Sequence, residues 1–235
     1  MATMRTRPAC LTPRIRDAIA GGPVEATVLG RFPASLYVAV PRAFGVLAIL
    51  SPAAVRLPCG VQVLDRQLPV GDVVVGDGTV RVGSVVIRAG RVVSARVARR
   101  PVPRQLAEVQ RVVAPVDIDA GLLGRGPGLT PSGDDVLAGY LVGATAYGST
   151  DQAADDVRRL VESQAAQCTT TLSAALLRHA AAGETIPQVS GLLDALGGSE
   201  GRHSLDRALA DLYAVGHTSG AALASGVVAA ARMAA

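Results

Sequence analysis

The sequence has 235 residues and a formal net charge of +4; 49% of its residues are hydrophobic, 18% are charged and 3% are aromatic. This balance excludes a disordered chain, and the scarcity of aromatic rings argues against a base-stacking nucleic-acid platform. The basic side chains are scattered arginines, with no lysine, so the charge does not indicate a nucleic-acid partner. It is mildly favourable for a small anionic substrate.

The sequence does not predict export or a membrane span. Its N-terminal residues are arginine-rich but lack the apolar segment of a signal peptide, and its three cysteines form no metal-binding spacing. The uncharged stretch Leu212–Ala231 has 20 residues, but its Gly-His-Thr-Ser-Gly segment and many alanines favour a buried helix over a membrane span. We therefore expect a soluble, cytoplasmic protein that binds no membrane, with reduced thiols and with Cys168 in the core.

The first half of the chain predicts a β-rich domain that opens with a short helix over residues 13–20. Gly76-Asp77-Gly78 predicts a hairpin turn, and Ala89-Gly90 predicts a second turn. Short β-branched runs between such turns indicate an antiparallel β-barrel or sandwich. The expected strands are Val24–Leu29, Ser35–Val40, Gly45–Leu50, Val61–Leu64, Val73–Val75, Thr79–Val82, Ser84–Ile87 and Arg91–Val97.

Beyond residue 115 the strand pattern gives way to helical periodicity, punctuated by glycine. The expected helices are Val136–Tyr147, Asp151–Cys168, Thr171–Ala182, Ser190–Leu196, Ser204–Val215 and Ala221–Ala234. The proline-containing residues 101–116 are interpreted as a linker. The predicted fold class is therefore α+β: a β-rich domain over residues 1–115, followed by an all-α domain over residues 116–235.

The segment Gly124–Asp135 carries the most specific chemistry. Its glycines let a ligand approach the backbone, and Thr130 and Pro131 suit the N-cap and the first position of a following helix. The N–H groups and dipole at a helix N-terminus suit phosphate or carboxylate. Asp134 and Asp135 point about 100° apart on a helix, so one of them could bind a hard cation such as Mg²⁺ while the other caps the helix. The segment is neither a P-loop nor a dinucleotide fingerprint.

Two further polar segments interrupt the apolar second half. In Gly216-His217-Thr218-Ser219-Gly220 the histidine could act as a general acid or base, or the segment could be only a capped turn between helices. In Gln167–Ser173, four hydroxyls lie near a helix start; they could hold anion oxygens, although a plain N-cap is the simpler interpretation.

The string Gly126–Asp135, GPGLTPSGDD, is followed in order by the blocks Thr170–Leu177 and Gly216–Gly220, and preceded by a weaker block at Val55–Gly60. Through these blocks the chain resembles the DUF2877 family, also called the AllH family. Its named member is a subunit of a three-component oxamate carbamoyltransferase of purine breakdown, which interconverts oxalurate and phosphate with oxamate and carbamoyl phosphate. The resemblance implies ureido or carbamoyl chemistry on a small carboxylate, together with partner subunits.

We therefore expect a carbamoyltransferase component whose site forms where the three polar segments converge. The expected catalytic residues are Asp134, Asp135 and His217, with Asp134 also the candidate Mg²⁺ ligand if a metal takes part. The expected substrate-binding residues are Gly126, Gly128, Thr130, Ser132, Gly133, Thr170, Thr171, Ser173, Thr218 and Ser219. Two alternatives stay open: a non-catalytic subunit of a multi-component enzyme, and a metal-dependent hydrolase or lyase. The expected partners are a small anion such as carbamoyl phosphate, other subunits and further copies of the chain.

Overall fold

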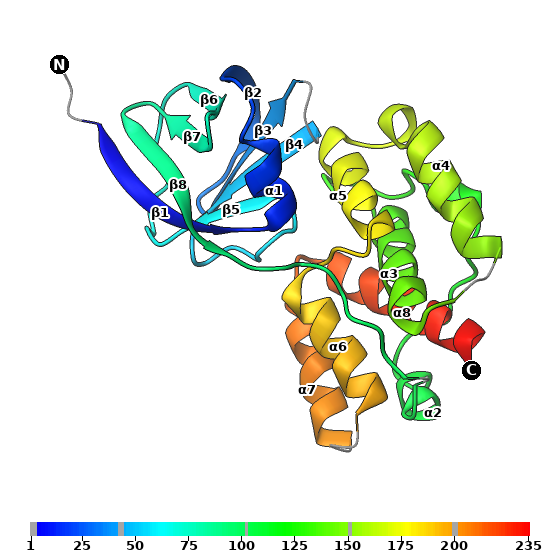
Figure 1. The fold of residues 1–235 in the computed structure, drawn as a ribbon. Coiled ribbons are helices and arrows are strands. Elements are labelled where there is room, and N and C mark those ends of the chain that lie inside the picture. Colours follow the sequence, from blue (N-terminus) through cyan, green and yellow to red (C-terminus); the bar gives the residue numbers. More distant parts are fainter. Residues whose placement is uncertain (1–3, 42–44, 102, 150–151, 199–201) are drawn as a thin grey trace. The chain divides into compact units, whose positions relative to one another are not determined.

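The structure is a computed structural model that describes residues 4–41, 45–101, 103–149, 152–198 and 202–235. It confirms the predicted α+β class, with a β-barrel followed by helices (Figure 1). The chain divides into two compact units, Met1–Ala95 and Arg96–Ala235. Residues 96–115, which the sequence analysis assigned to the first domain, thus group with the helices.

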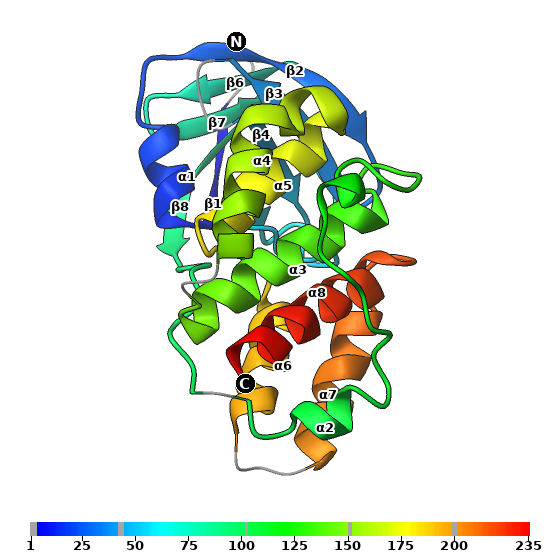
Figure 2. The same cartoon turned by 90° about the vertical axis from the view of Figure 1, so that its right-hand side faces the viewer.

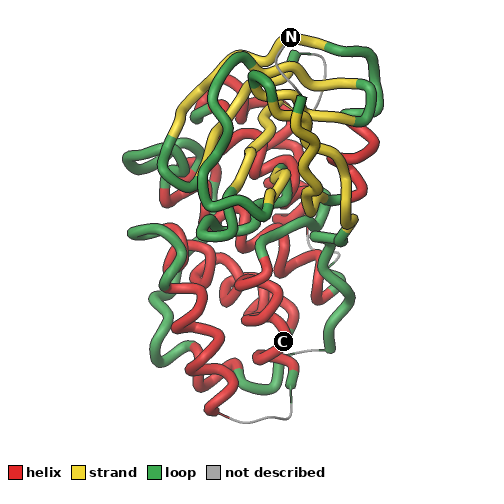
Figure 3. The backbone as a smooth tube through the Cα atoms, turned by 90° about the vertical axis from the view of Figure 1, so that its left-hand side faces the viewer, coloured by secondary structure: helices red, strands yellow, loops and turns green. Residues whose placement is uncertain are grey.

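The barrel unit is a closed sheet with the strand order β1-β5-β4-β3-β2-β6-β7-β8. Its strands are yellow in Figure 3. Among the described residues, neighbouring strands are antiparallel except for the parallel pairs β1–β8 and β4–β5. A short helix, α1 (Pro13–Ala18), follows the first strand, as predicted. The strands are β1 (Arg5–Leu11), β2 (Val24–Arg31), β3 (Ser35–Val40), β4 (Gly45–Leu50), β5 (Gly60–Val63), β6 (Val73–Gly76), β7 (Thr79–Val82) and β8 (Val85–Val92).

Local turn chemistry explains the hairpin between β6 and β7. Asp77 and Gly78 have φ angles of 50° and 70°, the left-handed conformation that a tight two-residue hairpin turn requires. The strands on either side alternate buried and partly exposed residues, with Val73, Val75, Val80 and Val82 buried. The predicted hairpin at Gly76-Asp77-Gly78 is therefore confirmed.

The barrel differs from the prediction at one strand and one turn. Strand β1 was not predicted, because its first four residues are two arginines, a threonine and a proline, and apolar residues follow only at its end. Ala89-Gly90 is not a turn: both residues lie inside β8, where Gly90 occupies a register shift opposite Ala9 and Cys10 of β1. A Cβ atom at Gly90 would come within 2.7 Å of Pro8 Cβ, so this glycine serves close strand packing.

The helical unit contains the predicted helices with small shifts at their ends (Figure 2). It also contains two short elements that were not predicted, α2 and the 3₁₀ helix η1. Asp151, the predicted start of one helix, lies outside the described residues. The elements are α2 (Leu106–Val109), η1 (Ala120–Leu122), α3 (Ser132–Tyr147), α4 (Gln152–Cys168), α5 (Thr171–Ala181), α6 (Pro187–Gly197), α7 (Arg202–Tyr213) and α8 (Ser219–Ala234).

Helices α3 and α8 lie side by side and form the centre of this unit (Figures 1 and 2). Glycines bring their backbones together: a Cβ atom at Gly139 would come within 2.2 Å of the Leu223 carbonyl oxygen, and one at Gly226 within 2.0 Å of the Val136 carbonyl oxygen. No larger residue fits at these crossings without moving a helix. The N-terminal ends of α3 and α8 are thereby held close to each other.

The predicted linker is instead a packed part of the helical unit. Backbone hydrogen bonds run from Val97 to Gly183, from Arg100 to Ala146 and from Arg104 to Leu196. The predicted strand Arg91–Val97 is also wrong in its second half, because β8 ends at Val92 and Arg96 forms only an isolated bridge with Glu184.

Two further expectations concern the membrane and the thiols. In the part of the chain that the structure describes, no helix is long and apolar enough to cross a membrane. The uncharged stretch from Leu212 is divided between α7 and α8. Cys168 is exposed at the end of α4, so its predicted place in the core is wrong. Cys59 is fully buried, and burial raises the pKa of its thiol to about 12.

Candidate functional site

The glycine-rich loop leads into α3 through a tight backbone path. Gly124 and Gly126 have φ angles of 73° and 119°, and a Cβ atom at Gly124 would come within 2.0 Å of the Cys168 carbonyl oxygen. The loop therefore lies directly against the end of α4, where only glycine fits. Pro131, not Thr130, occupies the N-cap of α3, and no side chain caps the helix. The predicted capping role of Thr130 is wrong, because its hydroxyl is used elsewhere.

Asp134 ties the loop to the start of α5. The N–H of Gly124 donates to its Oδ1 at 2.7 Å. The hydroxyls of Ser173, at 2.6 Å, and Thr169 both donate to its Oδ2. The side chain is 1% exposed, and these three donors take up most of the hydrogen-bonding capacity of a carboxylate. Asp134 thus holds two distant parts of the chain together.

Asp135 faces the other way, toward α8. It is 8% exposed, and the hydroxyls of Ser219 and Thr130 lie close enough to its carboxyl group to affect its pKa. Among the described residues its Oδ2 atom has no hydrogen-bond partner. The two aspartates thus point to different neighbours: Asp134 accepts three hydrogen bonds, and Asp135 has a buried Oδ2 without a partner among the described residues. The prediction that one of them caps α3 is wrong, because no side chain caps this helix.

Burial raises the pKa of Asp135 to about 7, because a carboxylate is poorly solvated away from water. The hydrogen bond from Ser219 opposes this rise, the charge of Asp134 adds to it, and the hydrogen bond from Thr130 opposes it. At neutral pH the group therefore exists in both protonation states, which is the property of an effective general acid or base.

Hydrogen bonds bring the three predicted polar segments together. The Thr170 hydroxyl donates to the Leu129 carbonyl at 2.5 Å and accepts from the N–H of Ser173 at 3.0 Å, so it also caps α5. The hydroxyls of Thr130 and Ser219 lie 3.1 Å apart. The glycine-rich loop thus contacts the start of α5 on one side and the start of α8 on the other.

The remaining predicted residues either lie exposed at the edge of the site or are glycines that allow close backbone packing. His217, Thr218 and Thr171 are exposed, and no side-chain hydrogen bond to a described residue is formed by His217. Gly128 is exposed, and Ser132 is partly exposed at the first turn of α3. Gly133 is buried against η1, where a Cβ atom would come within 2.0 Å of the Leu122 carbonyl oxygen.

The sequence analysis placed Gly124 among the glycines open to a ligand and Thr169 among hydroxyls that could hold an anion, and it gave no role to the Leu129 carbonyl; in the structure all three hold the site in shape. The hydroxyl cluster around Thr169 was a signal, but its partner Asp134 lies 35 residues away. Only the folded chain reveals such a pairing.

Residues 122–231 match the family model described as the oxamate carbamoyltransferase subunit AllH. These residues belong to the AllH family. The AllH region contains all three polar segments and every predicted site residue, whereas the weaker block at Val55–Gly60 lies outside the match. No solved structure matches the chain.

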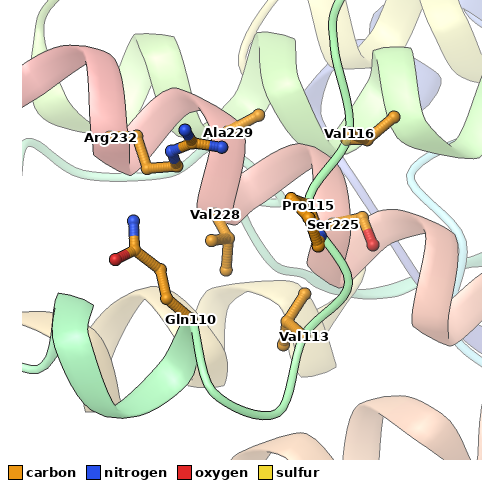
Figure 4. A pocket seen from close by; sticks show the side chains of 8 residues that line it. All are labelled: Gln110, Val113, Pro115, Val116, Ser225, Val228, Ala229 and Arg232. Carbon is orange, nitrogen blue, oxygen red and sulfur yellow. The ribbon is translucent and has the colours of Figure 1, made fainter.

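Three further observations concern parts of the chain other than the predicted site: the capacity for metal binding, a buried histidine pair and a pocket. In the described ranges, no group of three or more His, Cys, Asp or Glu side chains is arranged to hold a metal ion. Buried His179 of α5 pairs through Nδ1 with Glu184 Oε2 at 2.5 Å, and neither residue belongs to the three segments. A pocket of about 180 Å³ opens beside α8 (Figure 4), lined by Gln110, Val113, Pro115, Val116, Ser225, Val228, Ala229 and Arg232.

Proposed function

We propose that this chain is a subunit of a carbamoyltransferase that acts on oxamate or a related ureido acid, and that it binds a small anionic substrate within the AllH region. The family match supports a subunit of such an enzyme. The observation that carries the proposal is Asp135, a buried carboxyl with a free oxygen, at the point where the glycine-rich loop meets α8. In this proposal the chain takes part in the breakdown of purine-derived ureido compounds.

The glycine-rich loop is the proposed anion-binding element. The N–H groups of Gly126, Gly128 and Ser132 donate no hydrogen bond to another described residue. They lie immediately before or at the first turn of α3, whose N-terminus carries a partial positive charge. Unused N–H groups at such a position suit a phosphate or a carboxylate.

The two aspartates take different roles in this proposal. Asp134 is a positioning residue rather than a Mg²⁺ ligand, because its oxygens already accept from Gly124, Thr169 and Ser173. Asp135 is the proton-transferring residue. When the oxamate nitrogen attacks the carbamoyl carbon, a C–N bond forms, the C–O bond to phosphate breaks and the nitrogen loses a proton, which Asp135 Oδ2 accepts.

Residues at the rim would complete the site. His217 and Thr218 lie in the turn before α8, one and two residues from Ser219. Thr170, Thr171 and Ser173 lie at the start of α5, on the other side of the loop. In the proposal the exposed His217, Thr218 and Thr171 contact the substrate or the oxyanion that forms at the carbamoyl carbon. Thr170 and Ser173 hold the loop in place, because their hydroxyls already donate to the Leu129 carbonyl and to Asp134.

The test is the formation of a ureido product from carbamoyl phosphate and oxamate, with the purified chain alone and with the other components of the enzyme added. Loss of Asp135 as a base should lower the rate at least tenfold, or about 1.4 kcal/mol in barrier, in Asp135→Asn. Asp211→Asn, the same change at an exposed aspartate of α7, is the matched control. Full activity of Asp135→Asn in the assembled enzyme would reject a catalytic role and leave a non-catalytic subunit.

A further inference from the structure

The free Oδ2 atom of Asp135 is an unusual feature for a side chain that is 8% exposed. Buried polar atoms in native proteins are nearly always hydrogen-bonded, and an exception needs an explanation such as a ligand. Thr130 and Ser219 each have one hydroxyl proton, and their hydroxyls are hydrogen-bonded to each other, so at most one proton of the pair is left to donate to the Asp135 carboxyl, and Oδ2 has no partner. The missing donor must come from outside the described residues.

The glycine-rich loop and the first turn of α3 carry both unused hydrogen-bond donors and an unused acceptor. The N–H groups of Gly126, Gly128 and Ser132 are unused donors, which suit negatively charged oxygen atoms. The unused oxygen of Asp135, three residues after Ser132, is an acceptor, which suits an N–H group. A ligand complementary to both has a carboxylate at one end and a primary amide at the other.

We infer that Asp135 is a specificity-determining residue whose Oδ2 accepts a hydrogen bond from the –NH₂ group of a bound amido acid, while the N–H groups of the glycine-rich loop hold the carboxylate of that ligand. This inference rests on the proposed function, since it concerns the same site. It goes further in stating that recognition requires the amide N–H. Oxamate has the required groups, and oxalate, of nearly the same shape, replaces the –NH₂ by a charged oxygen.

Charged groups elsewhere do not substitute for Asp135 in this role. The charge of Asp134 raises the pKa of Asp135, and no cation is among the causes that shift the pKa of Asp135. The basic side chains on the helices that pack against α3 are Arg158, Arg159, Arg178, His179 and Arg232, and none of them is among the causes that shift the pKa of Asp135. An oxalate oxygen at the amide position would therefore meet two carboxylates and no compensating cation that acts on Asp135.

The experiment compares the binding of oxamate and oxalate to the full chain by isothermal titration calorimetry, at about pH 8.5, where a carboxyl with a pKa near 7 is ionised. The wild-type chain is expected to bind oxamate at least tenfold more tightly than oxalate. Asp135→Asn supplies an N–H donor in place of the acceptor, so this preference should disappear or reverse. Asp135→Ala removes the acceptor without adding a donor and should also lose the preference. Asp211→Asn, with an unchanged site, should keep it.

Three results would overturn the inference. The wild-type chain could bind the two ligands equally, the preference for oxamate could survive in Asp135→Asn, or no binding could be seen even with the other enzyme components present. Circular dichroism of each variant verifies that it is folded. The outcome is separable from the activity assay. Carbamoyl transfer without ligand discrimination would reject amide recognition alone, and discrimination without carbamoyl transfer would reject the proposed activity while amide recognition by Asp135 stands.

Discussion

In the described part of the barrel unit the buried polar side chains are three hydroxyls, those of Thr12, Ser35 and Ser51. The described part of the helical unit buries two carboxylates and an imidazole, in Asp134, Asp135 and His179, besides further polar groups. Burying an ionisable group is costly unless it is hydrogen-bonded, so a fold keeps such groups inside where they organise the structure or act on a ligand. The barrel is therefore the apolar, self-contained unit, and the helical unit carries the chemistry.

Within the helical unit, the adjacent residues Asp134 and Asp135 of α3 differ in how well their carboxylates are hydrogen-bonded. Asp134 accepts from three donors of the chain itself, and Asp135 retains a free oxygen. The hydrogen bonds to Asp134 stabilise the fold. The free oxygen of Asp135 can bind a ligand, but leaving it without a partner lowers the stability of the protein. Four substitutions test this contrast, from the largest expected effect to the smallest.

Asp134→Ala should destabilise the helical unit most. It leaves the N–H of Gly124 and the hydroxyls of Thr169 and Ser173 without their acceptor. Losing several hydrogen bonds to a charged group should cost about 3 kcal/mol or more. Urea unfolding followed by the helical circular dichroism signal measures this change. In the barrel, Ser51→Ala removes one acceptor, for the N–H of Ala53, and should cost only about 1 kcal/mol. Equal losses would contradict the contrast between the units.

Gly226→Ala should destabilise the α3–α8 pair, because its Cβ atom would come within 2.0 Å of the Val136 carbonyl oxygen. Overpacking of this kind costs about 1–3 kcal/mol. Gly191→Ala in α6 is the matched control: nothing lies within 4 Å of its Cβ atom, so better helix propensity should stabilise the protein by about 0.5–1 kcal/mol. Thermal unfolding of both variants checks the prediction, which fails if the two changes have the same sign.

Asp135→Asn should change how stability depends on pH. The pKa of Asp135 rises from 3.8 to about 7 in the folded protein, so the folded state binds a proton that the unfolded state has released. This contribution to stability is fully present below about pH 4 and is lost as the pH rises through about 7; it is on the order of 4 kcal/mol in all, of which about 2–3 kcal/mol is lost between about pH 5 and 8. The variant should lack this decline. Unfolding free energies of both proteins between about pH 5 and 8 test it, and parallel curves would contradict the raised pKa.

Gly78→Ala should have the smallest effect, because the barrel hairpin depends on local geometry alone. Gly78 has a φ of 70° and open space around its Cβ position, so the only penalty is the left-handed backbone, about 1 kcal/mol. Asp77→Gly, at φ 50°, should be neutral or slightly stabilising. A shift in melting temperature larger for Gly78→Ala than for Gly226→Ala would reverse the expected order.

Local signals determined much of the fold from the sequence. The left-handed turn at Asp77 and Gly78, the β-branched runs of the barrel and the period of the helices each depend on neighbouring residues, which a sequence displays directly. The same holds for the glycine-rich loop before α3 and for the different directions of Asp134 and Asp135, since helix geometry sets adjacent side chains about 100° apart. The missed strand β1 lacks a local pattern; its pairing with β8 and β5, not its composition, makes it a strand.

The tertiary structure decided what each polar residue does. Nothing near Asp134 in the sequence indicates that Thr169 and Ser173 will satisfy it, and nothing near Asp135 indicates that Ser219, 84 positions away, will leave one of its oxygens free. Burial and hydrogen-bond partners come from long-range packing, here from glycines that let α3 and α8 approach closely. The sequence alone therefore determined which residues could carry chemistry, and packing decided which of the two aspartates was left free to do so.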